Sequence, residues 1–142
     1  MSKQLRLTDE NLPTYLRGLG LADPTEEIEV EPAGDGNINW VRRARLSGGR
    51  SYVLKQARAA LEKFPEYEVS TDRLLFEARY LERTRPEDHE GLLPEVVRFD
   101  PGERVIVMED LTGATRLDAA QAAGQDVREP MEAVARFLAR VH

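Results

Sequence analysis

Short runs of apolar and β-branched residues, separated by turn-forming residues, predict five strands in this chain. Three of them lie between Ile28 and Gln56, with glycine-bearing turns at residues 34–37 and 47–50. The other two, Val96–Phe99 and Arg104–Met108, flank a turn that contains proline and glycine. Strands joined by tight turns pair antiparallel. The pattern therefore predicts an α+β domain built on a curled, five-stranded antiparallel sheet.

Apolar residues spaced three and four apart predict three helices. The first is expected from Asp9 to Leu19, with Thr8 as its N-cap. The second is expected from Thr71 to Arg83, because Pro86 prevents its continuation. This helix is expected to pack on the sheet. The third is expected from Glu129 to His142.

Two stretches show neither the strand pattern nor the helical spacing of apolar residues. Pro65, among aromatic residues, interrupts Ala57–Val69, where we expect a loop or a short broken helix. Small and polar residues dominate Thr112–Val127, which predicts a connector with one helical turn.

Composition excludes several functions. The chain has 142 residues and a net charge of −6, which disfavours nucleic acid or an anionic membrane as a partner. It contains no cysteine, and its two histidines, His89 and His142, are far apart, so we expect no metal site. No signal peptide and no apolar run of about 20 residues is present, which predicts a cytoplasmic location.

Glu77 occupies an unusual position in the second expected helix. It falls in the same helical arc as the apolar residues Leu74, Ala78 and Leu81. A carboxylate on a core-facing stripe costs free energy unless it is paired, so we expect a cationic partner for Glu77.

The order of a glycine turn, a strand lysine (Lys55) and a helix glutamate (Glu77) fits a device that binds nucleotide phosphates. Backbone N–H groups of the turn can cover phosphates, and the lysine can reach them while the glutamate restricts its rotamers. Taken singly, these features also fit a plain hairpin turn, a solvated lysine and a structural ion pair. Together they favour a protein-kinase type of nucleotide lobe, in which Met108–Leu111 is the hinge that contacts adenine.

The sequence resembles the aminoglycoside phosphotransferase and choline kinase-like superfamily of small-molecule kinases, and within it the methylthioribose kinases. The resemblance covers about residues 8–112 and rests on four motifs: Gly34-Asp35-Gly36-Asn37-Ile38-Asn39, Val53-Leu54-Lys55-Gln56-Ala57, Thr71-Asp72-Arg73 with Glu77-Ala78, and Met108-Glu109-Asp110-Leu111. It implies ATP and Mg²⁺ as cofactors. It also implies that Lys55 contacts the phosphates and that Glu77 orients Lys55. The remaining implied contacts are the phosphate cover at Gly34, Asp35, Gly36 and Asn37 and the adenine contacts at Met108, Glu109 and Asp110.

The sequence departs from the kinase pattern in two ways. The turn lacks the three glycines of protein kinases, so we expect the side chains of Asp35 and Asn37 in the site. No histidine- and asparagine-bearing catalytic loop is present, so we expect no catalytic residue here. The resemblance therefore implies three parts. Residues 1–27 form an N-terminal helix and loop, 28–111 the kinase-like N-terminal lobe, and 112–142 a linker and the first helix of a second lobe. The Mg²⁺ ligands are expected in the rest of that second lobe, outside residues 1–142.

The expected function is that of the nucleotide-binding lobe of an ATP-dependent phosphotransferase acting on a sugar or alcohol hydroxyl. A stand-alone, non-catalytic nucleotide-binding or protein-interaction module is the alternative. Expected partners are a nucleotide and a small-molecule substrate. Self-association is also expected, through an apolar surface that includes Val134, Phe137 and Leu138.

Overall fold

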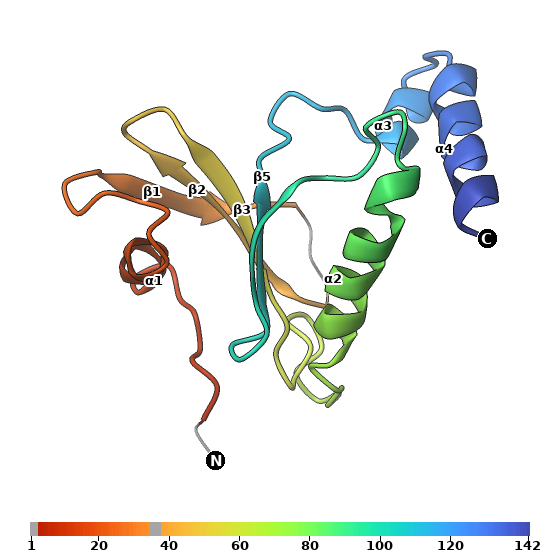
Figure 1. The fold of residues 1–142 in the computed structure, drawn as a ribbon. Helices are drawn as coiled ribbons and strands as arrows, with labels where there is room; N and C mark the ends of the chain where they lie inside the picture. Colours follow the sequence, from red (N-terminus) through yellow and green to blue (C-terminus); the bar gives the residue numbers. More distant parts are fainter. Residues whose placement is uncertain (1–2, 35–37) are drawn as a thin grey trace. The chain divides into compact units, whose positions relative to one another are not determined.

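The computed structural model describes residues 3–34 and 38–142. Its fold is α+β, with a five-stranded antiparallel open sheet in the order β1-β2-β3-β5-β4 (Figure 1). The strands are β1 Ile28–Pro32, β2 Trp40–Leu46, β3 Ser51–Gln56, β4 Val96–Asp100 and β5 Val105–Glu109. The helices are α1 Leu12–Gly18, α2 Arg73–Thr84, α3 Leu117–Ala122 and α4 Arg128–Val141, with a short 3₁₀ helix, η1, at Arg85–Glu87. The predicted α+β class and five-stranded antiparallel sheet are confirmed. Asp35, Gly36 and Asn37 of the predicted phosphate turn lie outside the described residues.

The chain divides into two compact units. The first comprises Met1–Ala78 and Glu95–Asp110 and contains the sheet, α1 and the start of α2. The second comprises Arg79–Pro94 and Leu111–His142 and contains the rest of α2 with η1, α3 and α4. The sequence-based division into residues 1–27, 28–111 and 112–142 remains a prediction.

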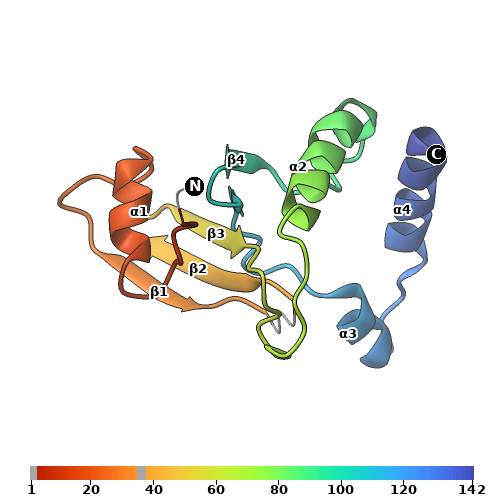
Figure 2. The ribbon, with the colours of Figure 1, turned by 90° about the horizontal axis from the view of Figure 1, so that it is seen from below.

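The sheet of the first unit is covered on both faces. Figure 2 shows α1 on one side of the sheet and the start of α2 on the other. Alternate residues of β3 point to opposite faces, which places Leu54 in the core with α1 and Lys55 on the face toward α2. The core on the α1 face consists of Leu7, Leu12, Leu16, Ala22, Trp40, Ala44, Leu46, Tyr52, Leu54, Val105 and Val107. The core on the α2 face consists of Ala57, Leu74, Ala78, Ile106 and Met108.

Two helices begin later than their sequence patterns predict. The Thr8 N–H donates to Asn11 Oδ1 at 2.7 Å and the Asn11 N–H to Thr8 Oγ1 at 3.2 Å, the reciprocal pair of a capping box. The regular helix α1 begins only at Leu12, because Pro13 has no N–H to donate to the Asp9 carbonyl. The Asp72 N–H donates to Ser70 Oγ at 3.1 Å, and α2 begins at Arg73 rather than Thr71. The predicted starts at Asp9 and Thr71 are therefore wrong by three and two residues.

The stretch from Ala57 to Val69 is a small hairpin-like loop. The Val69 N–H donates to the Ala59 carbonyl at 2.7 Å, and the Leu61 N–H donates to the Tyr67 carbonyl at 3.2 Å. An isolated bridge joins Ala60 to Glu68 between these bonds. The expectation of a loop is thus confirmed.

In the second unit, α4 buries Ala133 and Phe137, so the expectation that Phe137 belongs to an exposed apolar surface is wrong. It leaves Val134 40% and Leu138 42% exposed. Arg136 of α4 pairs with Glu90 at 2.9 Å. Within residues 3–34 and 38–142, the structure contains no helix that is both long and apolar enough to cross a membrane.

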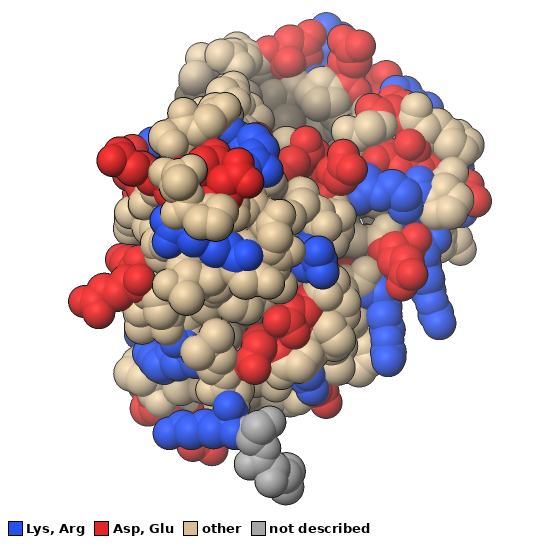
Figure 3. Space-filling model, turned by 60° about the vertical axis from the view of Figure 1, so that its left-hand side comes forward, with Lys and Arg blue, Asp and Glu red and all other residues tan. Residues whose placement is uncertain are grey.

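Acidic and basic side chains are interspersed over the face of the molecule drawn in Figure 3. Several charged side chains of the first unit are paired across neighbouring segments. Glu31 on β1 accepts hydrogen bonds from Arg43 and Arg45 on β2, and Arg50 pairs with Glu26. Hydrogen bonding from Arg43 lowers the pKa of the Glu31 carboxyl below its usual range.

Candidate functional site

Lys55 and Glu77 form an ion pair, with Lys55 Nζ 2.6 Å from Glu77 Oε1. Lys55 is on β3, on the face toward α2, and Glu77 is in the second turn of α2. The predicted cationic partner for Glu77 is therefore confirmed as Lys55. The side chains are 25% and 34% exposed, so the pair lies at the margin of the core rather than inside it. Leu74 and Ala78 of α2 make the buried contacts instead.

Strand register places an apolar surface beside this pair. Lys55 lies opposite Val41 on β2 and Ile106 on β5, and directly opposed residues share one face of a sheet. Two residues before Lys55, Val53 lies opposite Met108 on the same face. Val41 and Val53 are half-buried, and neither is among the site residues predicted from the sequence. Their even spacing from Lys55, along β3 or across the β2–β3 hairpin, is the signal that could have identified them.

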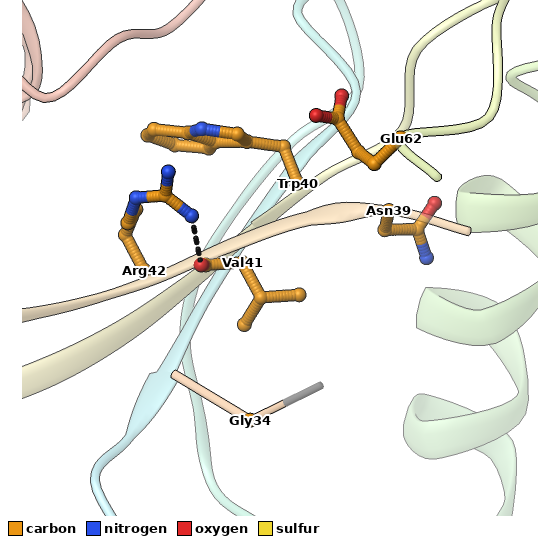
Figure 4. A pocket seen from close by; sticks show the side chains of 6 residues that line it. All are labelled: Gly34, Asn39, Trp40, Val41, Arg42 and Glu62. Carbon is orange, nitrogen blue, oxygen red and sulfur yellow. Dashed lines mark hydrogen bonds between the residues drawn. The ribbon is translucent and has the colours of Figure 1, made fainter. Parts of the chain in front are cut away.

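Gly34, the one described residue of the predicted phosphate turn, lies beyond β1 in a left-handed conformation with φ of +70°. That conformation favours glycine because a Cβ atom is strained there. Gly34 lines a pocket of about 170 Å³ together with Asn39, Trp40, Val41, Arg42 and Glu62 (Figure 4). The Ala33 N–H donates to the Val41 carbonyl at 3.5 Å, which closes the hairpin just before Gly34. The structure thus brings Gly34 to the strand residue that faces Lys55.

The Trp40 side chain lies on the face of β2 opposite to that of Val41. Its ring packs against the guanidinium carbons of Arg42 and Arg58, 5.0 and 4.9 Å from the ring centroid. Arg42 also donates to the Val41 carbonyl at 2.9 Å, the bond drawn in Figure 4. These contacts fix the strand that lines the pocket.

The predicted hinge follows β5, and its two acidic side chains bind other parts of the protein. Glu109 Oε1 accepts the Glu95 N–H at 2.9 Å. Asp110 is 4% exposed and accepts hydrogen bonds from Arg43 Nε at 2.9 Å and Ser51 Oγ at 2.6 Å. Met108, at the end of β5, is buried in the core on the α2 face. Both acidic side chains of the predicted hinge are therefore engaged within the protein.

The residues present fit a nucleotide better than a resident metal ion. An ammonium held by a carboxylate, beside an apolar surface and a glycine position, suits a phosphorylated, flat ligand. Among the described residues, no three histidine, aspartate or glutamate side chains lie close enough together to hold a metal ion.

The chain is similar to the methylthioribose kinase of Citrobacter koseri, with 33% identity over 122 residues. The match covers 79% of this chain and 29% of the kinase, so the chain spans less than a third of the length of that relative. No protein-family model matches the chain. The similarity indicates, at the coarsest level, a kinase-like relationship.

Proposed function

We propose that this chain is the nucleotide-binding lobe of an ATP-dependent small-molecule kinase, of the aminoglycoside phosphotransferase and choline kinase-like superfamily and methylthioribose kinase-like. The observation that supports this most is the Lys55–Glu77 ion pair at 2.6 Å, on the sheet face that also presents Val41. The similarity to the Citrobacter koseri methylthioribose kinase supports it independently. The substrate of the complete enzyme would be a sugar or an alcohol.

Each residue would have a distinct part in binding ATP. Lys55 would place its ammonium against phosphate oxygens, and Glu77 would hold the ammonium there. The surface formed by Val41, Val53 and Met108 would contact the flat base. Bound ATP with Mg²⁺ supplies the phosphoryl group. The catalytic aspartate and the Mg²⁺ ligands would come from a second lobe.

Ligand-dependent thermal stabilisation tests this proposal. ATP at about 100 times its Kd should stabilise the wild-type chain by about 2.7 kcal/mol. Lys55→Ala should abolish most of that gain. Lys63→Ala is the matched control, because Lys63 is an exposed lysine outside the candidate site and should keep the full gain. Equal stabilisation of the wild type and Lys55→Ala would remove Lys55 from the site, and no stabilisation of the wild type would contradict the proposal.

A second candidate, a protein-interaction module, rests on the exposed apolar side chains of α4. Met131, Val134 and Leu138 are 53%, 40% and 42% exposed and are spaced three and four residues apart, so they share one side of the helix. This surface would mediate association between copies of the chain. Sedimentation velocity should show a dimer that Val134→Glu with Leu138→Glu converts to a monomer. A wild-type chain that is monomeric at all tested concentrations would exclude this role.

A further inference from the structure

Lys55 and Ser51 lie on the same face of β3, with Val53 between them, because alternate residues of a strand share a face. At the Lys55 end this face is covered, since Ala57 is fully buried in one core with Leu74 of α2. Val53 and Ser51 are only half-buried. A ligand held at Lys55 would therefore extend along β3 toward Val53 and Ser51.

Ser51 binds the predicted hinge, because its Oγ donates to Asp110 Oδ2 at 2.6 Å. The Asp110 side chain is 4% exposed, and Arg43 Nε on β2 also donates to it, at 2.9 Å. These three side chains form the Asp110 cluster, which lies wholly within the first compact unit. Because β3 lies between β2 and β5 in the sheet (Figure 1), the cluster joins the three neighbouring strands around one carboxylate.

Side chains hold the predicted hinge at the point where strand pairing ends. The last pair between β3 and β5 joins Tyr52 to Glu109, so Asp110 lies beyond the ladder. On the β4 side, the Glu109 N–H donates to the Glu95 carbonyl at 3.0 Å and Glu109 Oε1 accepts the Glu95 N–H at 2.9 Å. On the other side, the Asp110 cluster replaces the missing ladder bonds. A hinge held in this way loses less conformational entropy when a ligand binds it.

The Asp110 cluster borders the apolar surface proposed for the base. Arg43 lies opposite Val53, and Val53 lies opposite Met108, so the three form one row across the strands. Ser51 is four residues from Lys55, which corresponds to about 13 Å along a strand. The apolar surface thus has the Lys55 ammonium at one end and the Asp110 cluster at the other.

We propose that Ser51 and Asp110 are positioning residues for the base end of the nucleotide site, and this inference rests on the proposed function. Their hydrogen bond fixes the backbone of the predicted hinge beside the apolar surface. Because Lys55 lies at the opposite end, the cluster affects the binding of the base and leaves the binding of the phosphates unchanged. A merely structural hydrogen bond would alter the stability of the fold without separating the two.

Calorimetric titration of the full chain with adenosine and with inorganic tripolyphosphate measures the two ends separately. Ser51→Ala removes the hydroxyl that donates to Asp110. It should weaken adenosine binding about fivefold, the loss expected for one hydrogen bond, while tripolyphosphate affinity stays within about twofold. Asp110→Asn removes the charge of the acceptor and should weaken adenosine binding at least as much, again with little effect on tripolyphosphate.

Ser47→Ala is the matched control. Ser47 lies in the turn between β2 and β3, and its Oγ accepts the Glu27 N–H at 3.1 Å. The change therefore removes one hydroxyl hydrogen bond from the same compact unit, outside the predicted hinge. Both affinities should equal those of the wild type.

Unchanged adenosine affinity in both Ser51→Ala and Asp110→Asn would overturn the inference. Equal losses for adenosine and tripolyphosphate, or the same adenosine loss in Ser47→Ala, would overturn it too. Failure of the proposed function looks different, because the wild-type chain itself would then not bind MgATP. The melting temperature of each variant without ligand, measured in parallel, establishes that the binding losses are those of folded protein.

Discussion

Arg43 Nε donates to both carboxylate oxygens of Asp110, at 3.0 and 2.9 Å, and so attaches β2 to the segment that follows β5. The same guanidinium reaches Glu31 on β1 at 3.0 Å through Nη1, and Ser51 on β3 donates to Asp110 at 2.6 Å. The network thus crosses three strands on the face of Lys55. Hydrogen bonds to Glu31 and Asp110 raise the pKa of Arg43.

Replacing Arg43 with methionine should destabilise the fold by about 2–3 kcal/mol, because Asp110 would lose a cationic partner while remaining only 4% exposed. Urea denaturation of the wild type and the variant measures this loss as a lower midpoint. Arg45→Met is the matched control. Arg45 is 43% exposed and pairs with Glu31 alone among these acids, so its loss should cost less than about 1 kcal/mol. Equal midpoints for the two variants would contradict the role of Arg43.

Gln56, the strand residue after Lys55, holds the N-terminal segment against the sheet. It is fully buried, and its amide donates to the Leu5 carbonyl at 2.7 Å and to the Glu103 carbonyl at 3.1 Å. Its Oε1 accepts the Leu7 N–H at 3.1 Å. Gln56→Leu should cost about 2–4 kcal/mol because it leaves the buried Leu7 N–H and two partly buried carbonyls without this partner.

The same denaturation measurement checks this prediction. Gln4→Ala provides the comparison, since Gln4 also donates to the Glu103 carbonyl, at 2.8 Å, from a half-buried position. Its loss should be closer to about 1 kcal/mol. If Gln56→Leu proved as stable as the wild type, the amide would not hold the segment.

The sequence pattern was sufficient for the sheet because each strand lies between strong turn signals and has a consistent face. The ion pair followed from a similar argument: Glu77 interrupts an apolar arc, and Lys55 is the lysine on the preceding strand. Both are local patterns that can be recognised from the spacing of residues along the chain.

The remaining contacts of the site depend on side chains far apart in the sequence. Asp110 reads as a hinge residue in sequence, yet its carboxylate binds Arg43, 67 positions away. Arg73 and Asn39 belong to two separate sequence motifs, yet nothing in the sequence shows that Arg73 binds Asn39, 34 positions away. Neither partner can be chosen from periodicity, since the chain contains many exposed charges that would fit equally well. The start of α1 was missed for a local reason, because Pro13 lacks the N–H that would continue the helical hydrogen bonds back to Asp9.

Ionisation of the Tyr15 hydroxyl should lower the stability of the protein at alkaline pH. Its hydroxyl donates to Asp100 Oδ2 at 2.9 Å, and burial together with this hydrogen bond raises the pKa of Tyr15 well above its usual value near 10. Because the folded-state pKa is the higher one, this contribution to stability is complete below about pH 10 and is lost as the pH rises further. Tyr15→Phe should reduce the fall in stability above about pH 10. Tyr67→Phe, at a 60% exposed position, is the control and should behave as the wild type does. An unchanged slope in Tyr15→Phe would show that the Tyr15 hydroxyl does not set the alkaline limit.

Glu77→Gln distinguishes a nucleotide site from an ion pair that is only structural. Both side chains are partly exposed, so losing the pair should cost at most about 1 kcal/mol of folding free energy, and the variant should remain folded. In a nucleotide site the ammonium of Lys55 would then sample more rotamers, and ATP affinity should also fall by about tenfold. Glu82→Gln is the matched control, because Glu82 is exposed on α2. A Glu77→Gln variant that is less stable yet binds ATP as tightly as the wild type would leave the pair a structural role alone.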